Sequence, residues 1–254
     1  MTFDKMSKEM ASDISSLAEG EFGEVIFDRA QMENLPTPDV FLHPAPDVME
    51  DWPSSRDNDW WDDLVHVHPY ILGLYIPMRS PGQVVLFGHN LRQFYWSLVH
   101  HVVRPNVPYL TKLDLAGAWK LVLMKTLEHE IFHHDSDVLR TMFGTSLERD
   151  TEEALAVAWA RFCIQDERSK WQSQIGRMNG LAYSLLMREA FRYRSPGYQD
   201  WGLYADEVRF KPAWLEYLKP GSHMRLQQNG VEMERLVYGM IGQVGAEGYV
   251  EKLR

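Results

Sequence analysis

The feature that most constrains the fold is a pair of consecutive helical segments joined by a very short turn. Residues 115–143 read LAGAWKLVLMKTLEHEIFHHDSDVLRTMF, a run of helix formers with Asp114 as its expected N-cap and Gly144 as its expected stop. Residues 145–148 then have capping-box spacing and predict a second helix over 146–168. Two helices joined by so short a turn pack antiparallel. We therefore expect this pair at the centre of the fold.

A small sheet is expected before the helix pair. Residues 65–78 are rich in β-branched and aromatic side chains, and a Ser-Pro-Gly turn leads into a second strand at 83–88. Further helices are predicted over 90–104, with Asn90 as the cap, and over about 173–193 and 231–242. The predicted fold class is α+β and mainly helical, with a small sheet over about 65–88 and a core helix pair 115–143 and 146–168.

The N-terminal quarter differs from the rest. Five prolines and many acids between residues 36 and 60 predict extended, irregular chain, because proline cannot continue a helix. We expect residues 1–60 to form a helical arm with a proline-rich strap, and residues 61–254 to form the main domain.

Charge and cysteine content limit the function classes. Thirty-six acids against 26 bases give a net charge of −10, which disfavours nucleic acid and anionic membranes as partners. Cys163 is the only cysteine, so no disulfide within the chain is expected. The first residues lack the apolar region of a secretory signal, and no apolar run approaches the ~20 residues of a membrane span. We expect a cytoplasmic protein.

The sequence HEIFH at 129–133 carries the strongest functional signal. In a helix, His129 and His133 lie one turn apart on the same face, so both imidazoles can reach one cation, and Glu130 flanks that face. A catalytic zinc takes three protein ligands, so a third is needed. Glu152 and Glu153 lie on the second helix, and an antiparallel arrangement brings both within about one turn of His133. Helical phase leaves both acids open as the third ligand.

This arrangement resembles the gluzincin branch of zinc metallopeptidases, whose thermolysin-like members pair HExxH with a helix-borne Glu about twenty residues later. The resemblance covers residues 128–157, where EEALA is similar to the Glu-x-x-Ala of several members. It implies a zincin-like domain in which His129 and His133 bind Zn²⁺ and Glu153 is the third ligand, with Glu152 as the alternative. Glu130 is then the general base that hydrolyses a peptide bond with metal-activated water.

Other residues complete the expected site. A carboxylate usually orients a metal-bound histidine, and Asp135 and Asp137 are the candidates. Gluzincins commonly add a downstream Tyr or His that stabilises the oxyanion, a role for which His223 is the first candidate here. The alternatives for that role are tyrosines: Tyr193, Tyr198 and Tyr204. The expected partner is a peptide or protein substrate beside the 83–88 strand, with a protein trigger as a further partner.

Two other readings stay open. A non-enzymatic helical protein could use its aromatic surface to bind a partner, with a structural or vestigial metal site. A di-iron carboxylate protein needs a second ExxH motif besides Glu130–His133, and the sequence has none.

Overall fold

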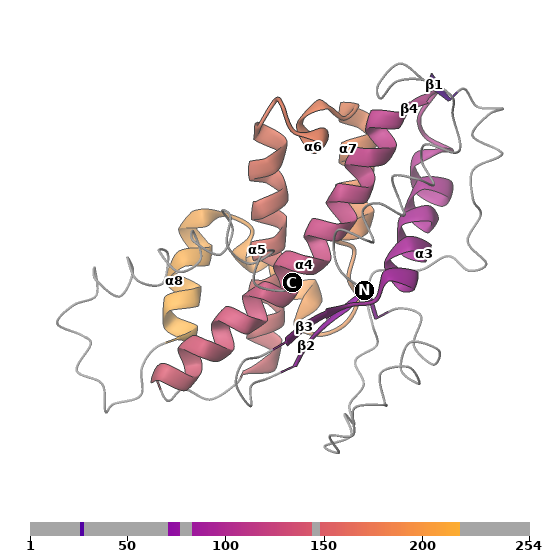
Figure 1. Ribbon diagram of the computed structural model, residues 1–254. Helices are drawn as coiled ribbons and strands as arrows, with labels where there is room; N and C mark the ends of the chain where they lie inside the picture. The colour runs from indigo at the N-terminus through magenta and orange to yellow at the C-terminus, as the bar shows by residue number, and fades with distance from the viewer. Residues whose placement is uncertain (1–25, 28–70, 77–82, 144–147, 219–254) are drawn as a thin grey trace.

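The described part of the protein is mainly helical, with two small antiparallel sheets. The computed structural model describes residues 26–27, 71–76, 83–143 and 148–218. Its centre is the helix pair α4 (Lys112–Phe143) and α5 (Arg149–Ser169), which lie side by side in Figure 1. Helix α5 carries several buried alanines, among them Ala154 and Ala158, whose small side chains allow neighbouring elements to pack closely against it. The predicted helix pair and the mainly helical α+β class are confirmed.

Helix α4 begins earlier than the sequence predicts. The Thr111 Oγ1 accepts a hydrogen bond of 3.1 Å from the backbone N–H of Asp114, whose Oδ2 accepts one of 2.9 Å from the N–H of Thr111. This reciprocal pair is a capping box, and it starts the helix at Lys112. The prediction of Asp114 as the N-cap was wrong, because Thr111 is the N-cap and Asp114 occupies the N3 position of the capping box.

The remaining helices surround the central pair (Figure 1). On one side of α4, helix α3 continues directly into the π-helical segment η2. Beyond α5 the described chain forms two short helices, a 3₁₀ segment and a further helix that packs against α5. The bounds are α3 Gly88–Leu98, η2 Val99–Val103, α6 Gln174–Arg177, α7 Gly180–Ala190, η3 Tyr198–Tyr204 and α8 Glu207–Tyr217.

The sheet that matters for the site is a hairpin. Strands β2 (Gly73–Ile76) and β3 (Gln83–Leu86) pair antiparallel, with Gly73 opposite Leu86, and both lie against α4. A second ladder joins β1 (Ile26–Phe27) to β4 (Leu110–Thr111). The hairpin confirms the predicted small sheet, with strands shorter than the sequence indicates.

Two further predicted helix boundaries were wrong. Asn90 lies inside the first turn of α3, whose N-cap is Phe87, because the Asn90 amide donates instead to the carbonyl of Ile71 at 2.8 Å. The single helix expected over 173–193 is divided into α6 and α7. The division falls at Asn179, whose side chain accepts from the backbone N–H groups of Leu181 and Ala182 and thereby starts a new helix.

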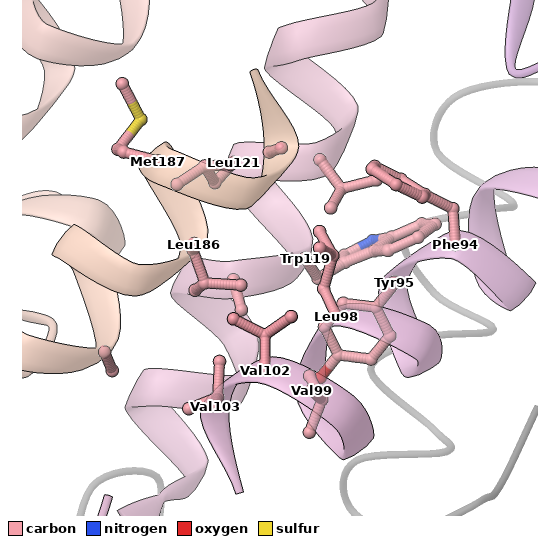
Figure 2. Packing of buried hydrophobic residues seen from close by; sticks show 14 of the residues in the cluster. Phe94, Tyr95, Leu98, Val99, Val102, Val103, Trp119, Leu121, Leu186 and Met187 are labelled. Atoms are coloured by element: carbon pink, nitrogen blue, oxygen red, sulfur yellow. The ribbon is translucent and has the colours of Figure 1, made fainter. Parts of the chain in front are cut away.

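Two hydrophobic clusters fill the interior. The larger packs α3, η2 and α7 against the first half of α4, and Figure 2 shows Trp119 and Leu121 of α4 among side chains of these helices. The smaller packs the second half of α4 and the outer face of α5 against α8, around Phe132 and Trp214. The HEIFH motif therefore lies where the two clusters meet.

Several sequence predictions fall outside the described residues. These are the strap at 36–60, the helix at 231–242, the turn at 144–147 and His223; of the proposed arm, only β1 is described. The division at residue 60 remains a prediction. None of the described helices combines the length and the apolar character needed to cross a membrane.

Candidate metal centre

Three side chains from α4 and α5 converge on one point. The Nε2 atoms of His129 and His133 lie 3.1 Å apart, and the Oε2 of Glu153 lies 3.1 Å from the first and 3.2 Å from the second. All three side chains are almost fully buried. Among the described residues, these three form the group that can hold a metal ion.

The triangle of donor atoms has the dimensions of one face of a metal tetrahedron. Ligands at about 2.0–2.1 Å from a tetrahedral zinc lie about 3.3–3.4 Å from one another. The observed edges of 3.1–3.2 Å are slightly shorter. Two imidazole nitrogens and one carboxylate oxygen also form the donor set of catalytic zinc sites, which leave a fourth position open. The residues present therefore fit such an ion.

Glu152 supports the site from behind His133. Its Oε1 accepts a hydrogen bond of 2.8 Å from the Nδ1 of His133. A carboxylate only accepts, so Nδ1 carries a proton, and once Nε2 loses its own proton the Nε2 lone pair faces the triangle. Arg140 lies 3.1 Å from the other oxygen of Glu152, and the Tyr217 hydroxyl of α8 donates to it. The sequence left open whether Glu152 or Glu153 would be the third member of the site. In the structure Glu153 belongs to the triangle, and Glu152 hydrogen-bonds to the far side of the His133 ring.

Glu130 lies beneath the hairpin. A Cβ placed on Gly73 would come within 3.0 Å of the Glu130 Cγ and 2.7 Å of the Thr126 Cγ2, so glycine is what lets β2 approach α4 so closely. The backbone N–H of Tyr75 donates to the Glu130 carboxylate. The strand beside the expected general base is therefore β2.

Burial sets the electrostatics of Glu130. Desolvation raises the pKa of Glu130 to about 7, against the opposing charges of His133 and Lys125. A carboxyl group with a pKa near neutrality can both take up and release a proton at physiological pH. This carboxyl is thus suited to proton transfer.

The two histidines differ in their affinity for protons. Burial lowers the pKa of His129 to about 4, so this ring is neutral near pH 7. Burial also acts to lower the pKa of His133, but the charge of Glu153 and hydrogen bonds to Glu152 and Glu153 raise it well above 6.5. Burial raises the pKa of Glu153 by itself, yet the charge of His133 and hydrogen bonds from both histidines hold it well below its usual value. A proton on His133 therefore neutralises the buried Glu153.

Two of the tyrosines predicted as candidates to stabilise the oxyanion lie at the site. Tyr198 stacks on the His129 ring with centroids 5.6 Å apart, and its hydroxyl donates to Glu153. The ring centroids of Tyr193 and Tyr198 lie 5.3 Å apart. Burial and the charges of Glu153 and Glu130 raise the pKa of Tyr193. Within the described part of the chain, the Tyr193 hydroxyl has no hydrogen-bond partner.

A tight turn places Tyr198. Gly197 has φ = 74°, and a Cβ on it would lie 2.8 Å from the carbonyl oxygen of Asp150 and 3.2 Å from the Cβ of Glu153. The left-handed backbone and the close approach to α5 both require glycine. The Ser-Pro-Gly sequence before Tyr198 thus brings η3 onto the end of α5 that carries Glu153.

The other proposed residues lie elsewhere. Asp135 contacts His134 at 3.0 Å, and Asp137 accepts from the Tyr75 hydroxyl at 2.8 Å and from Arg140 at 3.1 Å. The expected supporting carboxylate is therefore Glu152. Tyr204 packs in the smaller cluster, away from the triangle.

Lys125 is a site residue that sequence reasoning missed. It lies one turn before His129 on α4 and is only 6% exposed. Its Nζ lies 5.1 Å from the ring centroid of Tyr193 and 5.5 Å from that of Phe94. Desolvation lowers the pKa of Lys125 to about 8, although the charge of Glu130 acts in the opposite direction. The apolar rings that surround it come from distant segments, so the helical pattern alone carried no signal.

The lone cysteine takes no part in the site. Cys163 of α5 and Trp159 hydrogen-bond to Glu128 of α4, and burial raises the pKa of the thiol. Glu128 directly precedes His129 but faces the α5 interface.

No protein-family model, curated protein or solved structure matches this chain. The functional argument therefore depends on the geometry of the site.

Proposed function

We propose that this chain is a zinc-dependent hydrolase of peptide or other amide bonds, with a zincin-like site of the gluzincin type. The observation that supports this most is the His129–His133–Glu153 triangle, with its edges of 3.1–3.2 Å and with Glu130 on the adjacent helical position. His129, His133 and Glu153 would hold the ion. When bound, zinc supplies Lewis-acid chemistry, polarising a carbonyl group and making water more acidic.

Glu130 is the proposed general base. Its pKa of about 7 lets it accept a proton from the attacking water and later donate it to the leaving amine. The same carboxyl group then returns to its starting state after each turnover. The contact with the Tyr75 N–H holds the carboxylate beside β2. The substrate would therefore lie beside β2, and not beside the 83–88 strand that the sequence favours.

Tyr193 is the proposed stabiliser of the oxyanion. The hydroxyl of Tyr198 is engaged by Glu153, whereas that of Tyr193 has no partner within the described residues. A donor that is already in place when negative charge develops on the carbonyl oxygen stabilises the transition state. Among the described candidates, Tyr193 therefore fits this role best.

The test pairs zinc content with cleavage of a broad peptide library by wild type, Glu130→Gln and His133→Ala. Glutamine keeps the size of Glu130 but cannot accept the proton, so we expect near-normal zinc content and a loss of about 10²–10⁴ in turnover. His133→Ala should lose both zinc binding and turnover. Glu207→Gln changes an exposed glutamate of α8 and serves as the matched control, with both properties unchanged.

Two outcomes would refute the proposal. A Glu130→Gln variant with full activity would remove Glu130 as the base. A wild-type protein that takes up no zinc under zinc-supplemented expression would remove the metal site itself.

A further inference from the structure

Lys125 carries a charge for which the described structure provides no counterion. Its ammonium contacts the faces of Phe94 and Tyr193, and no described carboxylate lies within ion-pair distance of it. Glu130 is the acid whose charge acts on it, but the Glu130 carboxylate is held instead by the backbone N–H of Tyr75. The residue is 94% buried, since its exposed fraction is 6%.

A buried ammonium in this environment is costly. An ammonium has three donors, and removing it from water without an acceptor costs several kcal/mol. Contact with aromatic faces recovers only part of that cost, about 0.5–2 kcal/mol. Met or Leu would fill the same space without the penalty. The position is therefore suited to a ligand that brings the missing anion.

The ammonium is also close to the metal triangle. Lys125 precedes His129 by four residues, which is about 6 Å along a helix. Successive side-chain contacts connect the two: Lys125 lies over Tyr193, Tyr193 packs on Tyr198, and Tyr198 stacks on His129. The charge of Lys125 also acts on His129 and Glu130. A ligand bound at the triangle therefore has Lys125 within its reach.

Resting on the proposed function, we propose that Lys125 binds a carboxylate of the substrate and restricts hydrolysis to amides that carry one nearby. A peptide spans at most about 3.3–3.6 Å per residue, so the carboxylate belongs within one or two residues of the scissile bond. The two aromatic rings in contact with the ammonium keep water away from it and strengthen the contact. The carboxylate is either the free end of a peptide or an acidic side chain.

Binding of peptidyl hydroxamates tests this without turnover, because the hydroxamate anchors each probe to zinc. Three probes of equal length are used: one ends in a free carboxylate, one ends in a carboxamide, and one ends in a carboxamide but carries an aspartate beside the hydroxamate. Dissociation constants are measured by calorimetry on zinc-loaded wild type, Lys125→Met and Lys125→Arg. Methionine keeps the length of the stem without the charge, and arginine keeps the charge.

We expect wild type to bind at least one carboxylate probe about tenfold or more tightly than the neutral probe, as for a charge-assisted hydrogen bond. Lys125→Met should bind all three probes with similar affinity, and Lys125→Arg should retain part of the preference for a carboxylate. The probe that is preferred identifies the source of the carboxylate. If the methionine variant does not fold, Lys125→Gln replaces it.

The failures are distinguishable. Equal affinity of wild type for all three probes, or an undiminished preference in Lys125→Met, overturns the assignment of Lys125 and leaves the hydrolase proposal intact. Absence of zinc, or of binding by every probe, refutes the proposed function and this inference together.

Discussion

At the residue scale, His133 contacts two carboxylates, those of Glu152 and Glu153, through different ring nitrogens. Glu152 fixes the proton on Nδ1, and Glu153 shares the space in front of Nε2 with His129. The same two acids raise the pKa of His133, so in the metal-free protein a proton stands where the ion would bind. Metal and proton therefore compete for one nitrogen.

This competition predicts how zinc affinity depends on pH. Because the pKa of His133 is raised well above 6.5, zinc must displace a proton at neutral pH, and affinity should fall about tenfold per unit as pH decreases below that pKa. His129, with a pKa of about 4, adds no competition near neutrality. Calorimetry in buffers of different ionisation enthalpy should count about one proton released per zinc at pH 7. Affinity that is constant from pH 6 to 8 would contradict this prediction.

Replacing Glu152 should weaken zinc binding without removing a ligand. In Glu152→Gln the amide oxygen can still accept from His133, but its charge is lost, and we expect zinc affinity to fall by about 10–100-fold. Asp166→Asn, an exposed change on the same helix, is the control and should leave affinity unchanged. Competition with a chromogenic chelator measures both. Equal affinities in the two variants would show that Glu152 plays no part in the site.

At the element scale, the turn before η3 positions Tyr198 against His129. Gly197→Ala introduces a Cβ 2.8 Å from the Asp150 carbonyl in a left-handed backbone, and we expect a cost of about 1–3 kcal/mol in the free energy of unfolding. Tyr198 should shift with the turn, so zinc affinity should also decrease. Urea unfolding and chelator competition measure the two effects.

Gly202 provides the matched control. It lies within the same 3₁₀ segment, and a Cβ on it meets no atom within 4 Å. Gly202→Ala should leave zinc affinity unchanged and stability unchanged or slightly higher, because alanine restricts the unfolded chain. A similar loss in both variants would mean that the Gly197 turn has no special role.

The sequence predicts the parts of this architecture that depend on local periodicity. The helix pair and the pairing of His129 with His133 follow from the 3.6-residue repeat, and both are present. The sequence could not separate the roles of Glu152 and Glu153. Both side chains are buried, and neighbouring residues of a helix point in directions only about 100° apart, so either could face α4. Lys125 was missed because its aromatic neighbours, Phe94 and Tyr193, come from other elements. Contacts between distant segments leave no periodic pattern.

At the scale of the whole molecule, the site lies between two hydrophobic clusters. The first half of α4 belongs to one cluster and the second half to the other, while His129 and His133 lie near the middle of the helix. An ion held by α4 and α5 would therefore stabilise the junction of the two clusters.

Zinc should raise the thermal stability of the entire chain. A ligand at 100 times its dissociation constant stabilises the folded state by about 2.7 kcal/mol. For a protein of this size that corresponds to an increase in Tm of about 5–10 °C. Scanning calorimetry with zinc and with a chelator measures the change, and His133→Ala should show none. Identical Tm values for wild type under the two conditions would rule out a metal site that binds the folded state.

The contact between Glu128 and Cys163 has a practical consequence for labelling chemistry. The thiolate is the form that reacts with maleimides, and burial beside a carboxylate suppresses it. Because the chain has no other cysteine, a fluorophore can be attached at one chosen surface position with the native residue left in place. Trp171, 75% exposed in the segment after α5, is such a position for Trp171→Cys.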